Sequence, residues 1–280
     1  MNVSSEIGVL LDSVRRKSGV VHQITNYVTV NDCANITLAV GSSPIMADDG
    51  EEMDEIVSLA SALVLNMGTL NNHSIRAMQL AGRAANRLGV PLVIDPVGLG
   101  ASRLRNETMK LFLDVLKPQV IRGNMSEIAF LAGSGNQPKG VDVSLEDEKR
   151  MGAEGVQLAE SCARELGCII AITGKTDIIS NGTRTFCIEN GHQMLGRVTG
   201  TGCMCTALIA AFHTAAEISL EGSLLAAVGG VAAMGVAGEA AFDEAGEKGT
   251  ASFRTALIDA VSRLDGKKLQ NRSRLYEAEK

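Results

Sequence analysis

Aromatic side chains are scarce in this chain: its 280 residues include two Tyr, six Phe and no Trp. Proteins that hold single-stranded nucleic acid usually stack its bases on aromatic rings. The formal net charge of −6 also opposes binding to a phosphate backbone. We therefore expect no nucleic-acid partner, although a few well-placed groups can still bind a small phosphate compound.

Signals for disulfides, secretion and membrane insertion are also lacking. The six cysteines form no C-x-x-C pair, and residues 1–16 lack the apolar core and cleavage site of a signal peptide. The long uncharged stretches 198–216 and 222–238 are rich in small residues, which favours buried core helices over membrane spans. We expect a reduced, cytoplasmic protein with no membrane partner.

Three common catalytic or cofactor motifs are missing. The segment before Lys175 lacks the first glycine of a P-loop, and Arg103 stands where a dinucleotide fingerprint would need its third glycine. The chain has no G-x-S-x-G nucleophile elbow. These absences argue against P-loop ATPases, dinucleotide-binding enzymes and serine hydrolases.

Short apolar runs alternate with helical patterns through most of the chain. Strands are predicted at 20–24, 43–46, 63–67, 92–94, 120–122 and 169–173. Helices are predicted at 31–40, 52–60, 74–88, 104–116, 126–132 and 154–166. This alternation predicts an α/β fold with a mostly parallel central sheet and helices on both faces.

The rhythm changes after residue 173. Two short strands at 177–180 and 185–189 flank Asn181-Gly182, which is a hairpin signal, so an antiparallel edge should end the sheet. Three helices should follow, at 203–216, 221–242 and 251–264. We interpret the polar segment 134–149 as an exposed excursion, the charged residues 266–280 as a solvated tail, and the whole of 1–280 as a single domain.

Polar side chains follow nearly every predicted strand. Ligands of an open parallel sheet gather beyond the carboxyl ends of its strands, so this recurrence indicates a binding site. Each cluster alone would also suit a turn or a helix cap. The clusters are His22-Gln23-Ile24-Thr25-Asn26, Met46-Ala47-Asp48, Asn66-Met67-Gly68-Thr69, Asp95-Pro96-Val97-Gly98, Arg122-Gly123-Asn124 and Thr173-Gly174-Lys175.

Charged residues in these clusters have two interpretations each. Asp95 and Glu127 can hold Mg²⁺ directly or through its waters. Glu127 also stands three residues after Asn124, which is the spacing of a capping box, and the two roles are compatible. Arg122 can clamp a polyphosphate with two N–H groups, or it can form a surface ion pair.

The most informative local feature is Gly200-Thr201-Gly202-Cys203, which leads into a predicted helix. Backbone N–H groups at a helix start, unhindered by side chains, form a socket for anionic oxygen. This predicts phosphoryl transfer. A helix start can also lower a thiol pKa from about 8.5 toward neutrality, so Cys203 is a candidate to take a hydroxyl proton or to orient the hydroxyl.

Taken in order, six motifs make the chain resemble the hydroxyethylthiazole kinase family of the ribokinase-like superfamily. The likeness extends from about residue 20 to residue 264. It is carried by His22-Gln-Ile-Thr-Asn26-Tyr-Val, Ser43-Pro-Ile-Met46-Ala, Asn66-Met-Gly-Thr69-Leu, Asp95-Pro-Val-Gly98, Arg122-Gly-Asn124-Met-Ser-Glu127 and Val198-Thr-Gly-Thr-Gly-Cys203.

The resemblance implies a ribokinase-like fold and ATP-dependent phosphorylation of the hydroxyl of 4-methyl-5-(2-hydroxyethyl)thiazole in thiamine salvage. It implies Mg²⁺ as cofactor and a homotrimer whose thiazole pockets lie between neighbouring subunits. By position it implies substrate contacts at Asn26, Met46 and Gly200, ATP contacts at Arg122 and Thr173, an anion hole at Thr201 and Gly202, a metal side at Asp95 and Glu127, and a catalytic role for Cys203.

One departure from the superfamily leaves two alternatives. Relatives usually carry Asp after the glycine turn, where this chain has Cys203. A non-catalytic thiazole- or nucleotide-binding protein would explain the loss, but it would not need the retained Arg122, Asp95 and Glu127. A hydroxymethylpyrimidine kinase, a pyridoxal kinase or a nucleotide-hydrate dehydratase would share the scaffold, but these usually keep the Asp.

Overall fold

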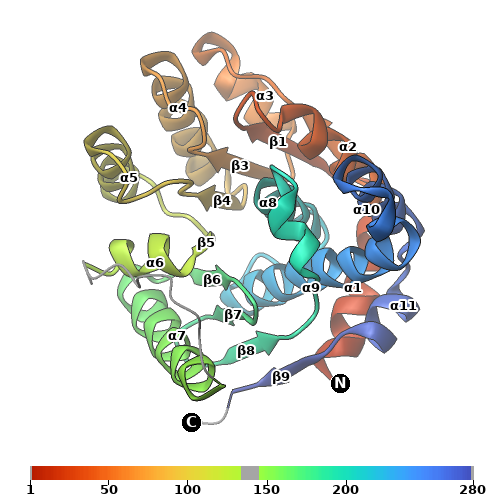
Figure 1. The fold of residues 1–280 in the computed structure, drawn as a ribbon. Helices are drawn as coiled ribbons and strands as arrows, with labels where there is room; N and C mark the ends of the chain where they lie inside the picture. The colour runs from red at the N-terminus through yellow and green to blue at the C-terminus, as the bar shows by residue number, and fades with distance from the viewer. Residues whose placement is uncertain (1, 134–144, 279–280) are drawn as a thin grey trace.

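The computed structural model describes residues 2–133 and 145–278. Within them, nine strands form one sheet in the order β2-β1-β3-β4-β5-β6-β7-β8-β9 (Figure 1). Strands β1 to β6 run parallel, while β7, β8 and β9 are antiparallel to their neighbours. The strands are β1 Val20–Ile24, β2 Ser43–Ile45, β3 Ala62–Asn66, β4 Leu92–Asp95, β5 Val120–Asn124, β6 Ile169–Thr173, β7 Asp177–Ser180, β8 Thr185–Ile188 and β9 Leu275–Glu277. The predicted α/β fold with a mostly parallel sheet is confirmed.

Helices cover both faces of the sheet (Figure 1). One layer contains α1 Val3–Lys17, α2 Val30–Val40, α8 Thr201–His213, α9 Leu220–Ala245, α10 Thr250–Arg263 and α11 Gly266–Arg272. The other contains α3 Met53–Leu59, α4 Asn72–Leu88, α5 Arg103–Val115, α6 Met125–Leu131 and α7 Leu145–Leu166. Short 3₁₀ turns occur at η1 Gly50–Glu52, η2 Gln193–Arg197 and η3 Gly246–Lys248.

The sheet divides the core into two apolar clusters. All five residues of β3 are buried, as expected for a parallel strand covered on both faces. Because successive side chains of a strand point to opposite faces, Val64 joins the cluster under α8 and α9, while Leu63 and Leu65 join the cluster under α4. This double coverage leaves the carboxyl ends of the parallel strands as the place where polar groups can gather.

The central helices α8 and α9 are nearly all apolar. The segment Leu220–Lys248, which includes α9, is long and apolar enough to cross a membrane, but 83% of its apolar window is buried inside the fold. Its small residues allow α8 and α10 to pack closely against it. That burial is the burial of a core helix.

One prediction about connecting segments is wrong, and a second is wrong in part. Within its described residues 266–278, the predicted charged tail forms α11 and β9, Leu269 is fully buried, and β9 adds a third antiparallel strand beside β8. Its lysines stand on the outer side of a short amphipathic helix, so a high charge density does not prevent docking. The predicted excursion at 134–149 overlaps α7, which begins at Leu145, and its remainder 134–144 lies outside the described residues.

Candidate active site

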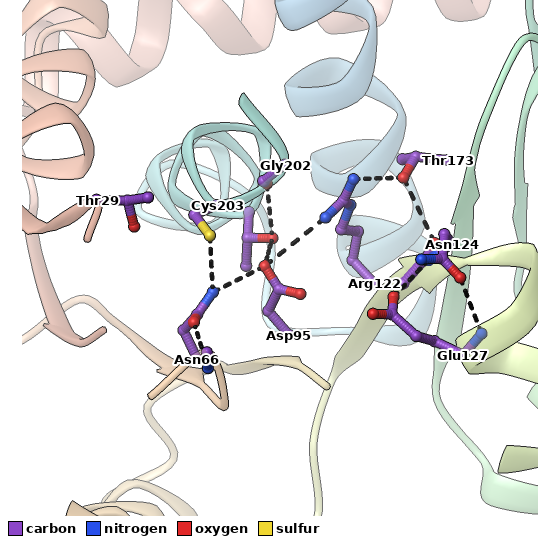
Figure 2. A network of polar contacts seen from close by, with 12 residues as sticks. Thr29, Asn66, Asp95, Arg122, Asn124, Glu127, Thr173, Gly202 and Cys203 are labelled. Carbon is purple, nitrogen blue, oxygen red and sulfur yellow. Dashed lines mark hydrogen bonds and ion pairs between the residues drawn. The ribbon is translucent and has the colours of Figure 1, made fainter. Parts of the chain in front are cut away.

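The predicted site residues gather around the start of α8, at the carboxyl ends of the parallel strands (Figure 2). Asn26 follows β1, Asp95 ends β4, Arg122 lies in β5 and Thr173 ends β6. The helix start brings Gly202 into the same region, close to the Arg122 side chain. Five segments that are distant in sequence therefore supply polar groups to one region.

Glycine is required at two positions of the helix start. Gly200 has a φ of +87°, in the left-handed region, and a Cβ added there would lie 2.5 Å from the Thr29 methyl carbon Cγ2. A Cβ on Gly202 would lie 2.7 Å from Nη1 of Arg122. In the described chain no side chain caps this helix, so its first N–H groups are available to an anion.

Arg122 is the cation of the site. Its Nη2 donates to the Thr173 hydroxyl, and its Nη1 lies 3.7 Å from Oδ2 of Asp95. Its Nε is buried without a hydrogen-bond partner among the described residues. Since a Cβ built on Gly202 would lie 2.7 Å from its Nη1, the guanidinium lies beside the helix start.

Asp95 is fully buried at the end of β4. Its Oδ2 accepts from Nδ2 of Asn66 at 2.9 Å and from the Thr206 hydroxyl at 2.8 Å. Burial raises the pKa of Asp95, and the charge of Arg122 opposes that rise. Its Oδ1 has no hydrogen-bond partner among the described residues, so one carboxylate oxygen remains for a ligand.

Cys203 lies on the opposite side of the helix start from Arg122 (Figure 2). Its Sγ accepts from Nδ2 of Asn26 and from Nδ2 of Asn66, each at 3.3 Å. Burial raises the pKa of the Cys203 thiol, and the nearby charge of Asp95 raises it further. The expectation that the helix start lowers this pKa is therefore wrong, because partial burial and a neighbouring carboxylate outweigh the helix N-terminus.

Glu127 forms the capping box that its spacing predicted. The side chain of Asn124 accepts from the Glu127 N–H at 2.9 Å, and Oε2 of Glu127 accepts from the Asn124 N–H at 2.8 Å. Its Oε1 accepts from the Gly98 N–H at 2.7 Å. Glu127 therefore ties the loop after β4 to the start of α6.

Asp95 and Glu127 are the candidate ligands for a metal ion. The described residues contain no group of three or more His, Cys, Asp or Glu side chains able to hold one. Mg²⁺ in phosphate sites usually keeps several waters and takes one or two carboxylates together with phosphate oxygens. Asp95 has an oxygen without a partner, and each Glu127 oxygen keeps a second lone pair. The residues fit a hydrated Mg²⁺ carried by phosphates.

A cavity of about 1110 Å³ opens beside this site. Its polar lining includes Arg122, Thr173, Thr201 and Gly202, and its apolar lining comes from η2 and α9. Cys203 does not line it, because successive residues of a helix point about 100° apart. The helix start thus separates a nucleotide-sized cavity from the amide and thiol cluster.

Met46 and Asn26 belong to the thiol side. Met46 follows β2, which pairs with β1, so it lies at the same end of the sheet as Asn26. Met46 is half-buried against the core cluster under α8. Asn26 is buried, and its Nδ2 also donates to Oδ1 of Asn66 at 2.9 Å.

Sequence reasoning assigned no individual role to Asn66, Thr206 or Asp177. Asn66 donates to both Asp95 and Cys203, and Thr206 holds Asp95 from the first turns of α8. Asp177 lines the cavity and accepts from the Gly174 N–H at 2.9 Å. The position of Asn66 at a strand end was the only available signal, since the other two roles depend on tertiary packing.

Comparisons with known proteins agree with one another. The profile of the Hydroxyethylthiazole kinase family matches residues 11–267. The hydroxyethylthiazole kinase of Clostridium beijerinckii is 51% identical, and that of Ruminiclostridium cellulolyticum 48% identical, each over 98% of both chains.

Solved structures extend the comparison. The structure of the hydroxyethylthiazole kinase protein from Pyrococcus horikoshii matches with a TM-score of 0.87 and 38% identity, over 98% of this chain and 99% of that one. The ADP complex of pyridoxal kinase from Staphylococcus aureus matches with a TM-score of 0.58 over 79% of this chain and 88% of that one. At 16% identity it shares only the fold.

Proposed function

The chain belongs to the hydroxyethylthiazole kinase family, and from that membership we propose which of its residues carry out the reaction. The reaction is the phosphorylation of the hydroxyl of 4-methyl-5-(2-hydroxyethyl)thiazole in thiamine salvage, with ATP as co-substrate. The proposal concerns the site residues, the metal, the assembly and the cellular location, and it takes 1–280 as one catalytic domain.

ATP occupies the cavity beside α8, with its terminal phosphates at the helix start. The observation that carries this proposal is the position of Nη1 of Arg122, 2.7 Å from where a Gly202 Cβ would lie, which places a fixed cation beside uncapped N–H groups. Thr173 accepts a hydrogen bond from Arg122 and lines the same cavity. Phosphoryl transfer depends mainly on alignment and charge neutralisation, which these groups supply.

The metal side lies at Asp95 and Glu127. Mg²⁺, when bound with the nucleotide, would neutralise charge on the phosphate oxygens. Asp95 offers its unpartnered Oδ1, and Glu127 holds the loop at Gly98, close to the end of β4. Arg122 beside Asp95 stabilises the ionised carboxylate against the cost of burial.

The thiazole alcohol binds on the other side of the helix start, against Asn26, Met46 and Gly200. Its hydroxyl lies next to the Cys203 thiol. Because the pKa of Cys203 is raised, the thiol carries its proton at neutral pH and orients the hydroxyl through hydrogen bonds. In the minor fraction of molecules whose Cys203 is ionised, the thiolate takes the hydroxyl proton as the new bond to phosphorus forms, and becomes a thiol.

A homotrimer completes the thiazole side. Tyr27 and Val28, which directly follow Asn26, are 78% and 55% exposed, and Leu38 on the adjacent α2 is 58% exposed. Neighbouring apolar side chains at this exposure are typical of an interaction surface. A neighbouring subunit would cover them and enclose the thiazole ring. With all six cysteines free, we also propose a cytoplasmic location.

Release of ADP with and without the thiazole alcohol tests the function. Alcohol-dependent ADP release and a thiazole phosphate of the expected mass are the expected results. Arg122→Ala should lower kcat/KM by about 10²- to 10³-fold, while Arg87→Ala, which breaks an exposed ion pair with Asp54, should change it little. The absence of any ADP release, with ATP or the thiazole alcohol still bound, would favour a binding protein.

A further inference from the structure

The C-terminal segment 265–277, called here the strap, reaches a wall of the nucleotide cavity. The strap contains α11 and β9, and β9 pairs with β8. Immediately after β8 the chain enters the loop 189–192, which lines the cavity. The strap and the cavity wall are therefore neighbours through β8, and a set of polar side chains joins them.

Asn190 binds the strap through both the oxygen and the nitrogen of its side-chain amide. It is 4% exposed, and its Oδ1 accepts from the Arg274 N–H at 2.6 Å. Its Nδ2 donates to the Arg272 carbonyl at 2.9 Å and to Oε1 of Glu239 at 3.2 Å. Since both ends of the amide are engaged, Asn190 lines the cavity without offering polar atoms to a ligand.

Glu239 of α9 accepts hydrogen bonds from both the loop 189–192 and the strap. Its Oε1 accepts from the Gly191 N–H at 2.9 Å and from Nη2 of Arg274 at 2.7 Å. Arg274 also donates to the Glu189 carbonyl at 2.6 Å. Burial acts to raise the pKa of Glu239, but the hydrogen bonds from Arg274, Gly191 and Asn190 outweigh it and lower the pKa. The carboxylate is therefore charged at neutral pH.

Apolar side chains of η2 and α9 border the cavity next to this wall. His192 stacks on Phe242 of α9, with ring centroids 3.6 Å apart and planes 21° apart. Leu195, Val231 and Met234 line the cavity beside it. A planar base buries best against such a surface, whereas the phosphates are drawn to the charged end of the cavity at Arg122.

We propose that Asn190, Glu239 and Arg274 form a positioning clasp through which the strap fixes the cavity wall that receives the base of ATP. None of the three side chains needs to touch the nucleotide. The clasp rests on the proposed function only in its assignment of this cavity to ATP. It gives the charged C-terminal segment a role in substrate affinity without any part in the transfer step.

Kinetics with Glu239→Ala and Arg274→Ala test the clasp. We expect the KM for ATP to rise about tenfold in each variant, with kcat and the KM for the thiazole alcohol within about twofold of wild type. The matched control is Glu277→Ala, which breaks a 2.9 Å ion pair with Arg184 at the far end of the strap. The control should leave the KM for ATP unchanged, because Arg184 is not part of the loop 189–192.

Inhibition by tripolyphosphate distinguishes a clasp that supports only the binding of the base from one that supports the whole cavity. Tripolyphosphate carries the phosphates but no base, so its inhibition constant should stay the same in the Glu239 and Arg274 variants. Equal losses for ATP and tripolyphosphate would overturn the proposal, and so would an unchanged KM for ATP in folded Glu239→Ala. If that variant does not fold, the near-isosteric Glu239→Gln serves instead, with a rise of about threefold expected.

Calorimetric binding of ATP keeps this test independent of the thiazole reaction. Should the wild-type protein fail to phosphorylate the thiazole alcohol, the proposed function would fall, while weaker ATP binding in Glu239→Ala would still support the clasp. Equal ATP binding by wild type and both clasp variants would overturn the clasp and leave the activity intact.

Discussion

Two asparagine amides and one buried carboxylate define the chemistry of Cys203. Asn66 donates to both Asp95 and Cys203, so the carboxylate and the thiol are linked through a single side chain. The amide of Asn26 adds a second donor to the sulfur. Amide donors favour a thiolate, but burial and the charge of Asp95 oppose it more strongly. The site therefore holds a protonated thiol whose hydrogen-bond geometry is fixed.

Variants of Cys203 should separate orientation from proton transfer. Cys203→Ala should lower kcat by about 10²-fold, the low end for acid–base assistance, because a protonated thiol contributes less than a ready base. Cys203→Asp should keep or improve kcat, since a carboxylate accepts the same two amide hydrogen bonds. The measurement is kcat from about pH 6 to pH 9.

Wild-type kcat should still be rising at the alkaline end of that range, because the raised pKa keeps the thiolate scarce. The profile of Cys203→Asp should be flatter, since a carboxylate is already ionised. Complete inactivity of Cys203→Asp, with intact ATP binding, would contradict a base or orienting role and point to a function specific to the thiol.

Asp177 should make stability depend on pH near neutrality. Burial raises the pKa of Asp177 to about 7, although the Gly174 N–H and Arg122 act to lower it. Between about pH 4 and pH 7 the folded protein keeps a proton that the unfolded chain has released, so stability falls as pH rises through that window. Asp177→Asn removes this titration and keeps an acceptor for the Gly174 N–H.

The melting temperature of Asp177→Asn, relative to wild type, should therefore increase from about pH 5 to pH 8. The exposed Asp54, paired with Arg87 at the surface, provides the control variant Asp54→Asn. Parallel melting curves for wild type and Asp177→Asn across this range would show that Asp177 is ionised in the folded protein at all these values.

At the level of elements, the sequence predicted regular strands better than charged segments. The apolar runs of β1 and β6 have sharp polar ends, and their predicted bounds match the structure. Helix α7 begins at Leu145, nine positions before the predicted start at 154. Its first turns are rich in acidic residues, which a helix N-terminus favours but which resemble a loop in sequence. The strap was missed because its many charged and polar residues, most of them basic, also resemble a loop in sequence.

The sequence could predict those site residues whose positions depend only on the strand ends and on the start of α8. Those elements bring Arg122, Thr173 and Gly202 together because parallel strands end at one edge of the sheet. Sequence could not show that Thr206 holds Asp95, since that contact spans 111 positions. Nor could it show the desolvation that raises the pKa of Cys203, which depends on what packs around the thiol.

The start of α8 should tolerate no added side-chain atom. In Gly202→Ala the new Cβ would meet Nη1 of Arg122 at 2.7 Å, while the guanidinium is held by Thr173 and Asp95. We expect kcat/KM for ATP to fall by about 10²-fold, with a small change in melting temperature. Gly196→Ala is the control, since Gly196 lines the same cavity and its Cβ would meet nothing within 4 Å. Equal activity of the two variants would contradict the proposed anion hole.

For the whole molecule, the exposed apolar residues beside Asn26 should govern assembly. Tyr27→Lys places a charge in the proposed interface, so we expect a shift from trimer to monomer by light scattering, and a rise of about tenfold or more in the KM for the thiazole alcohol. The KM for ATP should change little, because the nucleotide cavity is built from one chain.

Ile218→Lys provides the matched control for assembly. Ile218 is 77% exposed, as much as Tyr27, but it follows the carboxyl end of α8, whereas Tyr27 lies near the amino end. We expect this variant to stay trimeric. A wild-type chain that is monomeric at all concentrations, with full activity, would contradict the proposed assembly.

The two edge strands of the sheet are short. Both β2 and β9 contain only three residues, and β2 includes Pro44, which has no N–H to donate. Long unpaired edge strands can pair with strands of other molecules and so promote aggregation. Because β9 pairs with β8 and is itself short, little unpaired main chain remains at this edge for a strand from another molecule. Loss of β9 should therefore make the protein prone to fibrillar self-association even where the remaining fold survives.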